Sequence, residues 1–229
     1  MVDENLIMRK NFIIKKNPFS ISIAQKISLL IIFLFFIFLS SFSPFLDDST
    51  KHLSKGLIYF VNQRFTRAEY EFKWLINHEV EKDSAYYFLS QLYLEKGMIN
   101  EADKMLSQLS GSSKFKFYHY YSALIKMKKG KFEEALEEIE KGIQEEPSEE
   151  RYYYLKGYIF FLMANFDSAI NELKKGIFYN PYNDDALFLL GICYLKKLEI
   201  EKAKLVLKRL EETGSEFYSP FRKLLENGK

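Results

Sequence analysis

The stretch that decides the fold is residues 150–183, ERYYYLKGYIFFLMANFDSAINELKKGIFYNPYN. A small residue, Gly157, is followed one helical turn later by the aromatic Phe160, and twelve residues later by Ala169. Leu173 continues from that alanine at helical spacing, which predicts the buried stripe of a second helix. Pro181 ends the unit, because the residue before a proline is pushed out of helical conformation.

The same pattern recurs along most of the chain. The alanine stands at intervals of 34, 33, 34 and 34 residues: Ala68, Ala102, Ala135, Ala169 and Ala203. Twelve positions earlier the residue is small: Gly56, Ser90, Ala123, Gly157 and Gly191. Nine positions earlier it is aromatic in all but one unit: Tyr59, Tyr93, Lys126, Phe160 and Tyr194. Four positions later it is apolar: Phe72, Leu106, Ile139, Leu173 and Leu207. Such a period predicts a repeat architecture.

This pattern resembles the tetratricopeptide repeat, a helix–turn–helix unit of 34 residues. The resemblance covers five units: 49–82, 83–115, 116–149, 150–183 and 184–217. The family's leading Trp is replaced throughout, by His52, Tyr86, His119, Tyr153 and Leu187. The resemblance implies an all-α, right-handed superhelical solenoid with a concave inner face. Residues 218–229 carry a helix-start signal and a short apolar stripe, so we expect a capping helix over the fifth unit.

In this family the first helix of each unit faces the groove, so the resemblance also predicts which side chains line it. The first row is Leu53, Tyr87, Tyr120, Tyr154 and Phe188. The second is Leu57, Gln91, Leu124, Tyr158 and Ile192. The third is Phe60, Leu94, Met127, Phe161 and Leu195. The first row is expected to form an aromatic ladder across the units. Some members grip a peptide carboxylate with Lys, Asn and Arg on this face; these rows lack them, so that activity is not carried over.

An apolar groove of this kind suits an amphipathic helix or an apolar extended segment of a protein partner, with tyrosine hydroxyls as polar contacts. Two alternatives stay open. The ladder is buried by tight packing or by the chain's own terminus, or it receives the helix of a second copy in a homo-oligomer. The stretch YYYLKGYIFF, residues 152–161, divides accordingly: Tyr153, Gly157 and Phe160 follow the buried pattern, and the rings at 154, 158 and 161 face the groove.

The N-terminal part predicts a membrane anchor. Residues 27–46 carry no charge, and twenty helical residues span about 30 Å, the apolar thickness of a bilayer. Residues 1–26 hold five basic residues, which places this segment in the cytoplasm and the repeats on the exported side. A cleaved signal peptide is the alternative: Ser41 and Ser43 are small enough for cleavage, but Pro44 would then open the mature chain.

The rest of the composition argues against several functions. The body after residue 46 is nearly neutral and lacks the basic stripe that nucleic acid requires. His52, His78 and His119 have no zinc-ligand spacing, Cys193 stands in an apolar context, and no phosphate loop or nucleophile motif occurs. Glutamate runs at 133–134, 137–138 and 145–146 are typical of a solvated face. We expect no cofactor, no metal and no enzyme activity, but a membrane-anchored docking scaffold in a bacterial envelope.

Overall fold

The computed structural model describes residues 48–109 and 115–227, and every regular element in these ranges is an α-helix. The predicted basic segment 1–26 and membrane helix 27–46 lie outside the described residues. Among the helices that are described, none combines the length and the hydropathy needed to cross a bilayer.

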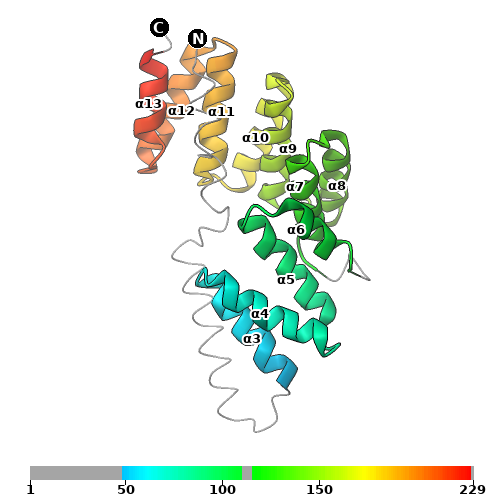
Figure 1. The fold of residues 1–229 in the computed structure, drawn as a ribbon. Helices are drawn as coiled ribbons and strands as arrows, with labels where there is room; N and C mark the ends of the chain where they lie inside the picture. The colour runs from blue at the N-terminus through cyan, green and yellow to red at the C-terminus, as the bar shows by residue number, and fades with distance from the viewer. Residues whose placement is uncertain (1–47, 110–114, 228–229) are drawn as a thin grey trace. The chain divides into compact units, whose positions relative to one another are not determined.

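The chain divides into two compact units, with the boundary between Phe115 and Lys116. Among its described residues, the first contains four helices: α3 (Asp48–Val61), α4 (Phe65–Asn77), α5 (Lys82–Glu95) and α6 (Ile99–Leu106). Consecutive helices pack as the pairs α3 with α4 and α5 with α6, and α4 also packs on α5 (Figure 1). Two predicted repeat ranges, 49–82 and 83–115, therefore each contain one helix pair.

The second compact unit contains seven helices in the described range: α7 (Tyr118–Lys128), α8 (Phe132–Glu145), α9 (Glu150–Leu162), α10 (Phe166–Tyr179), α11 (Asp184–Lys196), α12 (Ile200–Glu212) and α13 (Tyr218–Asn227). They pack as three pairs, α7–α8, α9–α10 and α11–α12, followed by α13 (Figure 1). The first helices of successive pairs, α7, α9 and α11, also contact one another in turn. The architecture is a stack of helix pairs with a single closing helix.

The recurring small residues allow the two helices of a pair to approach closely. A Cβ atom added to Gly157 would lie 2.7 Å from Cγ of Leu173 on the partner helix, and one added to Gly56 would lie 2.5 Å from the ring of Phe72. The five repeat alanines are fully buried. The last unit differs in one respect: Leu207, expected in the buried stripe, is half-buried, and the neighbouring Val206 is buried instead.

The turn inside each pair has the same backbone geometry. A residue with positive φ follows the first helix at five equivalent places: Gln63, Gly97, Gly130, Ala164 and Leu198. In the fourth unit the N–H groups of Ala164 and Asn165 donate to the carbonyls of Phe161 and Phe160, at 3.0 and 2.9 Å. This is the Schellman pattern, in which a left-handed residue satisfies the last carbonyls of a helix. Three of the five turns thus carry a side chain where glycine is favoured.

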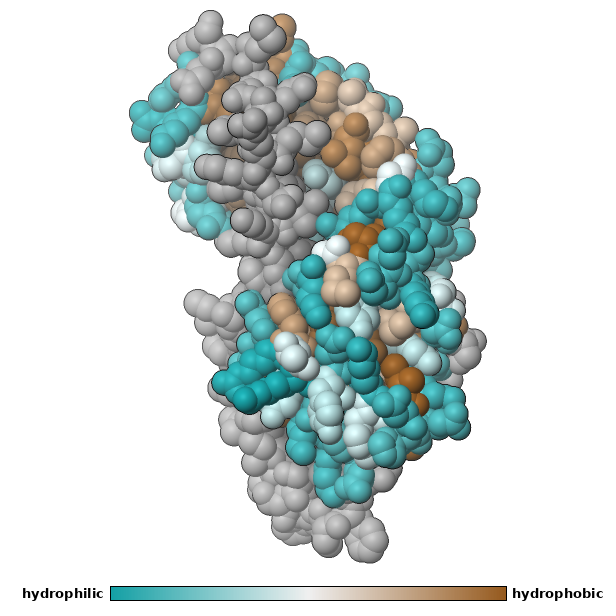
Figure 2. Space-filling view, viewed as in Figure 1, coloured by the Kyte–Doolittle hydropathy of each residue, from teal (hydrophilic) through white to brown (hydrophobic). Residues whose placement is uncertain are grey.

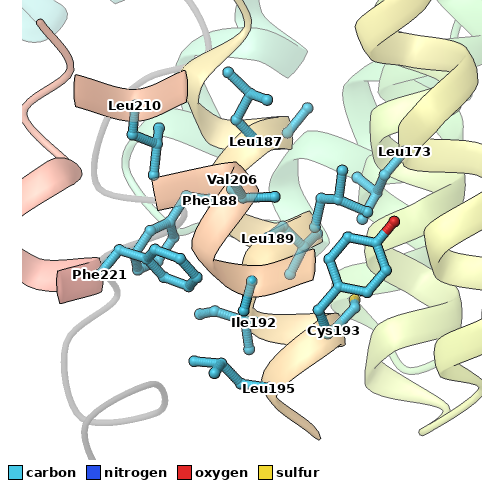
Figure 3. Close-up of a cluster of buried hydrophobic side chains, with 14 of the residues drawn as sticks. Leu173, Leu187, Phe188, Leu189, Ile192, Cys193, Leu195, Val206, Leu210 and Phe221 are labelled. Carbon is cyan, nitrogen blue, oxygen red and sulfur yellow. The ribbon is translucent and has the colours of Figure 1, made fainter. Parts of the chain in front are cut away.

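The core of the last units includes the closing helix α13. Phe221 of α13 is fully buried, and its ring lies where a Cβ atom on Gly191 would come within 2.4 Å. Figure 3 shows Phe221 beside Phe188 of α11, and their ring centroids are 5.9 Å apart. Cys193 is buried in the same cluster, and this burial raises its pKa to about 12, so the thiol is a packing residue.

Candidate partner-binding surface

The fifteen predicted groove residues lie on the first helices α3, α5, α7, α9 and α11, and none of them is exposed. Eight are buried: Tyr87, Gln91, Leu94, Tyr120, Met127, Phe188, Ile192 and Leu195. Seven are half-buried: Leu53, Leu57, Phe60, Leu124, Tyr154, Tyr158 and Phe161. In the second compact unit, α9 is therefore the helix whose three predicted groove residues all keep some accessible surface.

These three residues form a continuous row of rings along α9. Tyr154 stacks on Tyr158 with centroids 6.4 Å apart, and Tyr158 stacks on Phe161 at 6.5 Å. Phe161 then meets Phe166, the first residue of α10, at 5.9 Å. All four pack against the buried cluster of the last units. We call Tyr154, Tyr158, Phe161 and Phe166 the α9 ring row.

The direction of this row differs from the ladder expected across the units. The first-row rings of successive units do not stack on one another in the described ring contacts. Tyr87 stacks on Phe115 at 4.6 Å, and Tyr120 meets Tyr152 edge to face at 6.2 Å. Positions three and four apart on one helix are neighbours on its surface, so the row follows the axis of α9.

The last first-row residue, Phe188, belongs to the cap. Its ring stacks on Phe217 at 4.8 Å and meets Phe221 edge to face. It is only 6% exposed. The segment after the fifth unit packs over the first helix of that unit. Phe188, the last ring of the predicted ladder, is therefore buried by the chain's own C-terminal segment.

The tyrosines of the α9 ring row carry polar groups into this apolar surface. Burial, reinforced by Asp185 and by the hydroxyls of Tyr120 and Tyr158, raises the pKa of Tyr154 well above its ordinary value. Burial also raises the pKa of Tyr158. Neither hydroxyl forms a hydrogen bond with any residue in the described ranges. Both are thus neutral hydroxyls with hydrogen-bonding capacity to spare.

The predicted solvated glutamate face is wrong at one position. Glu138 of α8 is buried, and its carboxylate lies 2.8 Å from Nδ1 of His119 on α7. Lys141 and Lys126 donate to the other carboxylate oxygen at 2.9 and 3.1 Å. Burial opposes ionisation, but the hydrogen bonds from His119, Lys141 and Lys126 outweigh it and lower the pKa of Glu138 to about 2. This cluster is an ion-pair network between the helices of one pair.

Apolar side chains are exposed at the ends of α9 and α10, and also at other places such as Tyr70, Leu198 and Leu205. Leu162 and Met163 are exposed where α9 ends, and Phe178 and Tyr182 are exposed around the end of α10. Figure 2 shows hydrophobic colour gathered where Figure 1 places α9 and α10. Within the described residues, no group of His, Cys, Asp and Glu side chains is arranged to hold a metal ion.

Two segments of the chain match a family model described as tetratricopeptide repeat: residues 83–111 and 150–183. The second segment is the fourth helix pair, α9 and α10, and the first covers α5 and α6. In these two segments the match agrees with the resemblance that the sequence indicated. No curated protein sequence matches it significantly.

Solved structures share the fold at low sequence identity. A crystal structure of MamA protein superposes with a TM-score of 0.59 and 19% identity, covering 72% of this chain and 91% of that one. MamA from Desulfovibrio magneticus RS-1 gives a TM-score of 0.60 at 16% identity, with 73% and 94% covered. YrrB, described as a TPR protein with an unusual peptide-binding site, gives 0.54 at 17% identity, with 77% and 89% covered. At these identities the likeness establishes the fold alone.

Proposed function

We propose that this protein is a non-catalytic scaffold that binds a protein or peptide partner on the face formed by the first helices of its second compact unit. The observation that carries the proposal is the α9 ring row: four half-buried rings in one line, with two tyrosine hydroxyls that bond to no described residue. YrrB, a distant structural neighbour described as having a peptide-binding site, adds support from the same fold.

The chemistry of the row defines the partner that fits it. Stacked rings offer a large apolar area at low cost in side-chain entropy, so the partner presents apolar side chains, as an amphipathic helix or an extended segment does. The hydroxyls of Tyr154 and Tyr158 then donate to, or accept from, the partner's polar groups. Because both tyrosines have raised pKa values, they are neutral at physiological pH and repel neither sign of charge.

Site-specific crosslinking in cells tests this function. A photoreactive amino acid replaces Tyr154 or Tyr158 in the full chain, and Leu198, which is 79% exposed in the α11–α12 turn, serves as the control position. We expect a discrete adduct from positions 154 and 158 and none from 198. Adducts of equal yield at all three positions would mean that the row is not a specific surface.

We further propose that residues 27–46 anchor the scaffold in a bacterial envelope membrane, with the repeats on the exported side. The uncharged run and the five upstream basic residues support this orientation. Protease added to intact spheroplasts should digest the repeats of the full chain. Protection of the repeats would overturn the orientation, and recovery of a shorter chain in the soluble exported fraction would instead indicate a cleaved signal peptide.

A second candidate is self-association, in which the surface receives a helix of another copy. The cap favours it, because Phe221 of α13 and the preceding Phe217 already pack on the first helix α11. The same crosslinking experiment separates the two candidates. An adduct of twice the chain mass, containing only this protein, supports self-association, and a heterologous adduct supports the scaffold.

A further inference from the structure

An open pocket of about 470 Å³ lies between the second helices α10 and α12, beside the turn that joins α10 to α11. Its base is formed by the apolar side chains of Ile177 and Leu190, which are 7% and 6% exposed. Phe178, which is 78% exposed, stands at its side. The complete lining is Lys174, Ile177, Phe178, Pro181, Leu190 and Arg209. It contains two cations and no carboxylate.

The turn beside the pocket is held in place by hydrogen bonds. Asn180 accepts from the N–H of Tyr182 at 3.2 Å, and its amide donates to Glu150 at 3.2 Å. Asn183 caps α11 by accepting from the N–H of Ala186 at 2.9 Å. Arg209 donates from Nη2 to the carbonyl of Pro181 at 3.2 Å, and the remaining N–H groups of its guanidinium stay available as donors. These hydrogen bonds fix the backbone of the turn that carries the exposed side chains beside the pocket.

The preceding repeat shows what fills the equivalent place. There, between α8 and α10, the Lys156 ammonium lies 2.5 Å from Glu140 and 3.6 Å from Glu172. Lys175 pairs with the same Glu172 at 3.0 Å. Lys156 is only 15% exposed, so its charge is neutralised in a largely buried setting. Two carboxylates and two ammonium groups of the chain thus fill the position that corresponds to the pocket.

The four corresponding positions one unit later, 34 residues on, are Lys174, Leu190, Val206 and Arg209. Both carboxylates are gone: Glu140 is replaced by a lysine and Glu172 by a valine. Lys156 is also replaced, by Leu190, so this place holds two cations, Lys174 and Arg209, beside apolar side chains. Lys174 forms no hydrogen bond or ion pair with the described part of the chain. The third and fourth repeats fill this position with their own carboxylates. Between the fourth and fifth repeats the same position is an open pocket with two basic side chains.

We propose that this pocket binds an acidic peptide segment of a partner protein, which supplies an aspartate or glutamate side chain to Lys174 and Arg209 and an apolar side chain to the base. In the preceding repeat the side-chain carboxylate of Glu172 pairs with Lys175, which stands at the position of Arg209, so we assign the ligand group to a side chain and not to a chain terminus. Arg209 offers its guanidinium fork for a carboxylate. Phe178 and Pro181 provide the apolar walls for the neighbouring residue.

The pocket is formed by α10, α12, Pro181 of the α10–α11 turn and Leu190 of α11, whereas the α9 ring row lies on α9 with one ring from the start of α10. The proposal thus goes beyond the function proposed above and gives the scaffold a second, chemically different docking surface. The two are separated by variants: Tyr158→Ala removes a ring from the row, and Lys174→Glu reverses a charge at the pocket.

The test is a selection of random peptides on the detergent-solubilised full chain, followed by fluorescence anisotropy of selected peptides on variants. We expect peptides that combine Asp or Glu with a neighbouring Leu or Phe. Lys174→Glu should weaken their binding about tenfold or more, since it replaces an attraction by a repulsion. Lys208→Glu is the matched control: Lys208 adjoins Arg209 on α12 but lies outside the pocket, and this variant should bind normally.

A charge exchange completes the test. A selected peptide whose acid is replaced by lysine should bind the Lys174→Glu chain better than it binds the wild-type chain. Three results would overturn the proposal: no enrichment of acidic residues, equal weakening by the variants at 174 and 208, or binding that is lost when the peptide's C-terminus is amidated. A loss of binding only in Tyr158→Ala would assign the peptides to the α9 ring row instead.

Discussion

Nδ1 of His119 lies 2.8 Å from Oε2 of Glu138, and this contact joins the first helix of a repeat to the second. The relationship recurs: His52 and Glu71, at the same positions two units earlier, are 2.5 Å apart. Each of these glutamates follows its repeat alanine by three residues and is buried. A buried acid with a basic partner is thus a second, polar link between paired helices, beside the contact of the small residues.

The stability supplied by Glu138 should depend on pH. Its folded pKa of about 2 lies below the ordinary value of 4.5, so its contribution is present above about pH 5 and is lost as pH falls toward 2. Because glutamine keeps the shape of the buried side chain and one acceptor oxygen but loses the charge, we expect Glu138→Gln to lower the free energy of unfolding by about 1–2 kcal/mol at pH 7. The difference from wild type should shrink as the pH of urea unfolding is lowered.

The control for this experiment is Glu137→Gln on the same helix, where the side chain is exposed. It should change stability by less than about 0.5 kcal/mol at any pH. A difference between Glu138→Gln and wild type that stays constant from pH 7 to pH 3 would contradict the assigned role of the carboxylate.

Two glycine-to-alanine substitutions should have opposite effects. Alanine favours a helix interior by about 1 kcal/mol. A Cβ atom at Gly157 would lie 2.7 Å from Leu173, so Gly157→Ala should destabilise the chain by about 1–3 kcal/mol in spite of this preference. At Gly176 the nearest atoms are 3.4 Å away, and Gly176→Ala should be neutral or stabilising. Urea unfolding of both variants gives the comparison, and equal effects would show that the close approach at 157 relaxes freely.

Relieving a strained turn should stabilise the fourth repeat. Ala164 has φ of 57°, a region that costs a non-glycine residue about 1–2 kcal/mol. Ala164→Gly removes this cost but raises the entropy of the unfolded chain, for a net gain of about 0.5–1 kcal/mol. Gly130→Ala, at the equivalent turn with φ of 75°, is the reverse experiment and should lose a similar amount. Thermal unfolding of the pair checks both signs.

Loss of the cap ring should destabilise the last repeat. Phe221 is fully buried against Gly191 and Phe188, so Phe221→Ala should lower the free energy of unfolding by about 3–5 kcal/mol. Phe178→Ala, which removes an exposed ring, should stay within about 0.5 kcal/mol. Hydrogen exchange should accelerate first in α11 and α12. Uniform acceleration of exchange along the chain would mean that the cap does not stabilise the last repeat specifically.

Much of the fold could be predicted from the sequence because its determinants are local and periodic. The alanine and small-residue positions specify where two helices meet, and a period of about 34 fixes the helix pairs observed in every predicted range. The cap was also foreseeable, since Ser219 and Pro220 indicate a helix start and the stripe after them is apolar. These features depend on residue type at fixed spacing, which a sequence displays directly.

The parts that the sequence did not reveal depend on neighbours in space. Glu138 looks solvated beside other glutamates, and only the position of His119 across the pair shows why it is buried. Positive φ at Gln63, Ala164 and Leu198 carries no glycine signal, so these turns are visible only by their register with Gly97 and Gly130. The groove rows remain a prediction. The stacking of rings along α9 depends on side-chain orientation, which spacing alone does not determine.

The closing helix also limits how long the array can become. Helix α13 occupies the register of a first helix in a sixth repeat, because Tyr218 stands 34 residues after Asp184. Leu225 then falls where every complete repeat has glycine, serine or alanine, and it is 8% exposed. A branched side chain at that position denies a sixth second helix its close approach. The chain thus begins another repeat and blocks its completion with one residue, so growth by duplication would first have to replace this leucine.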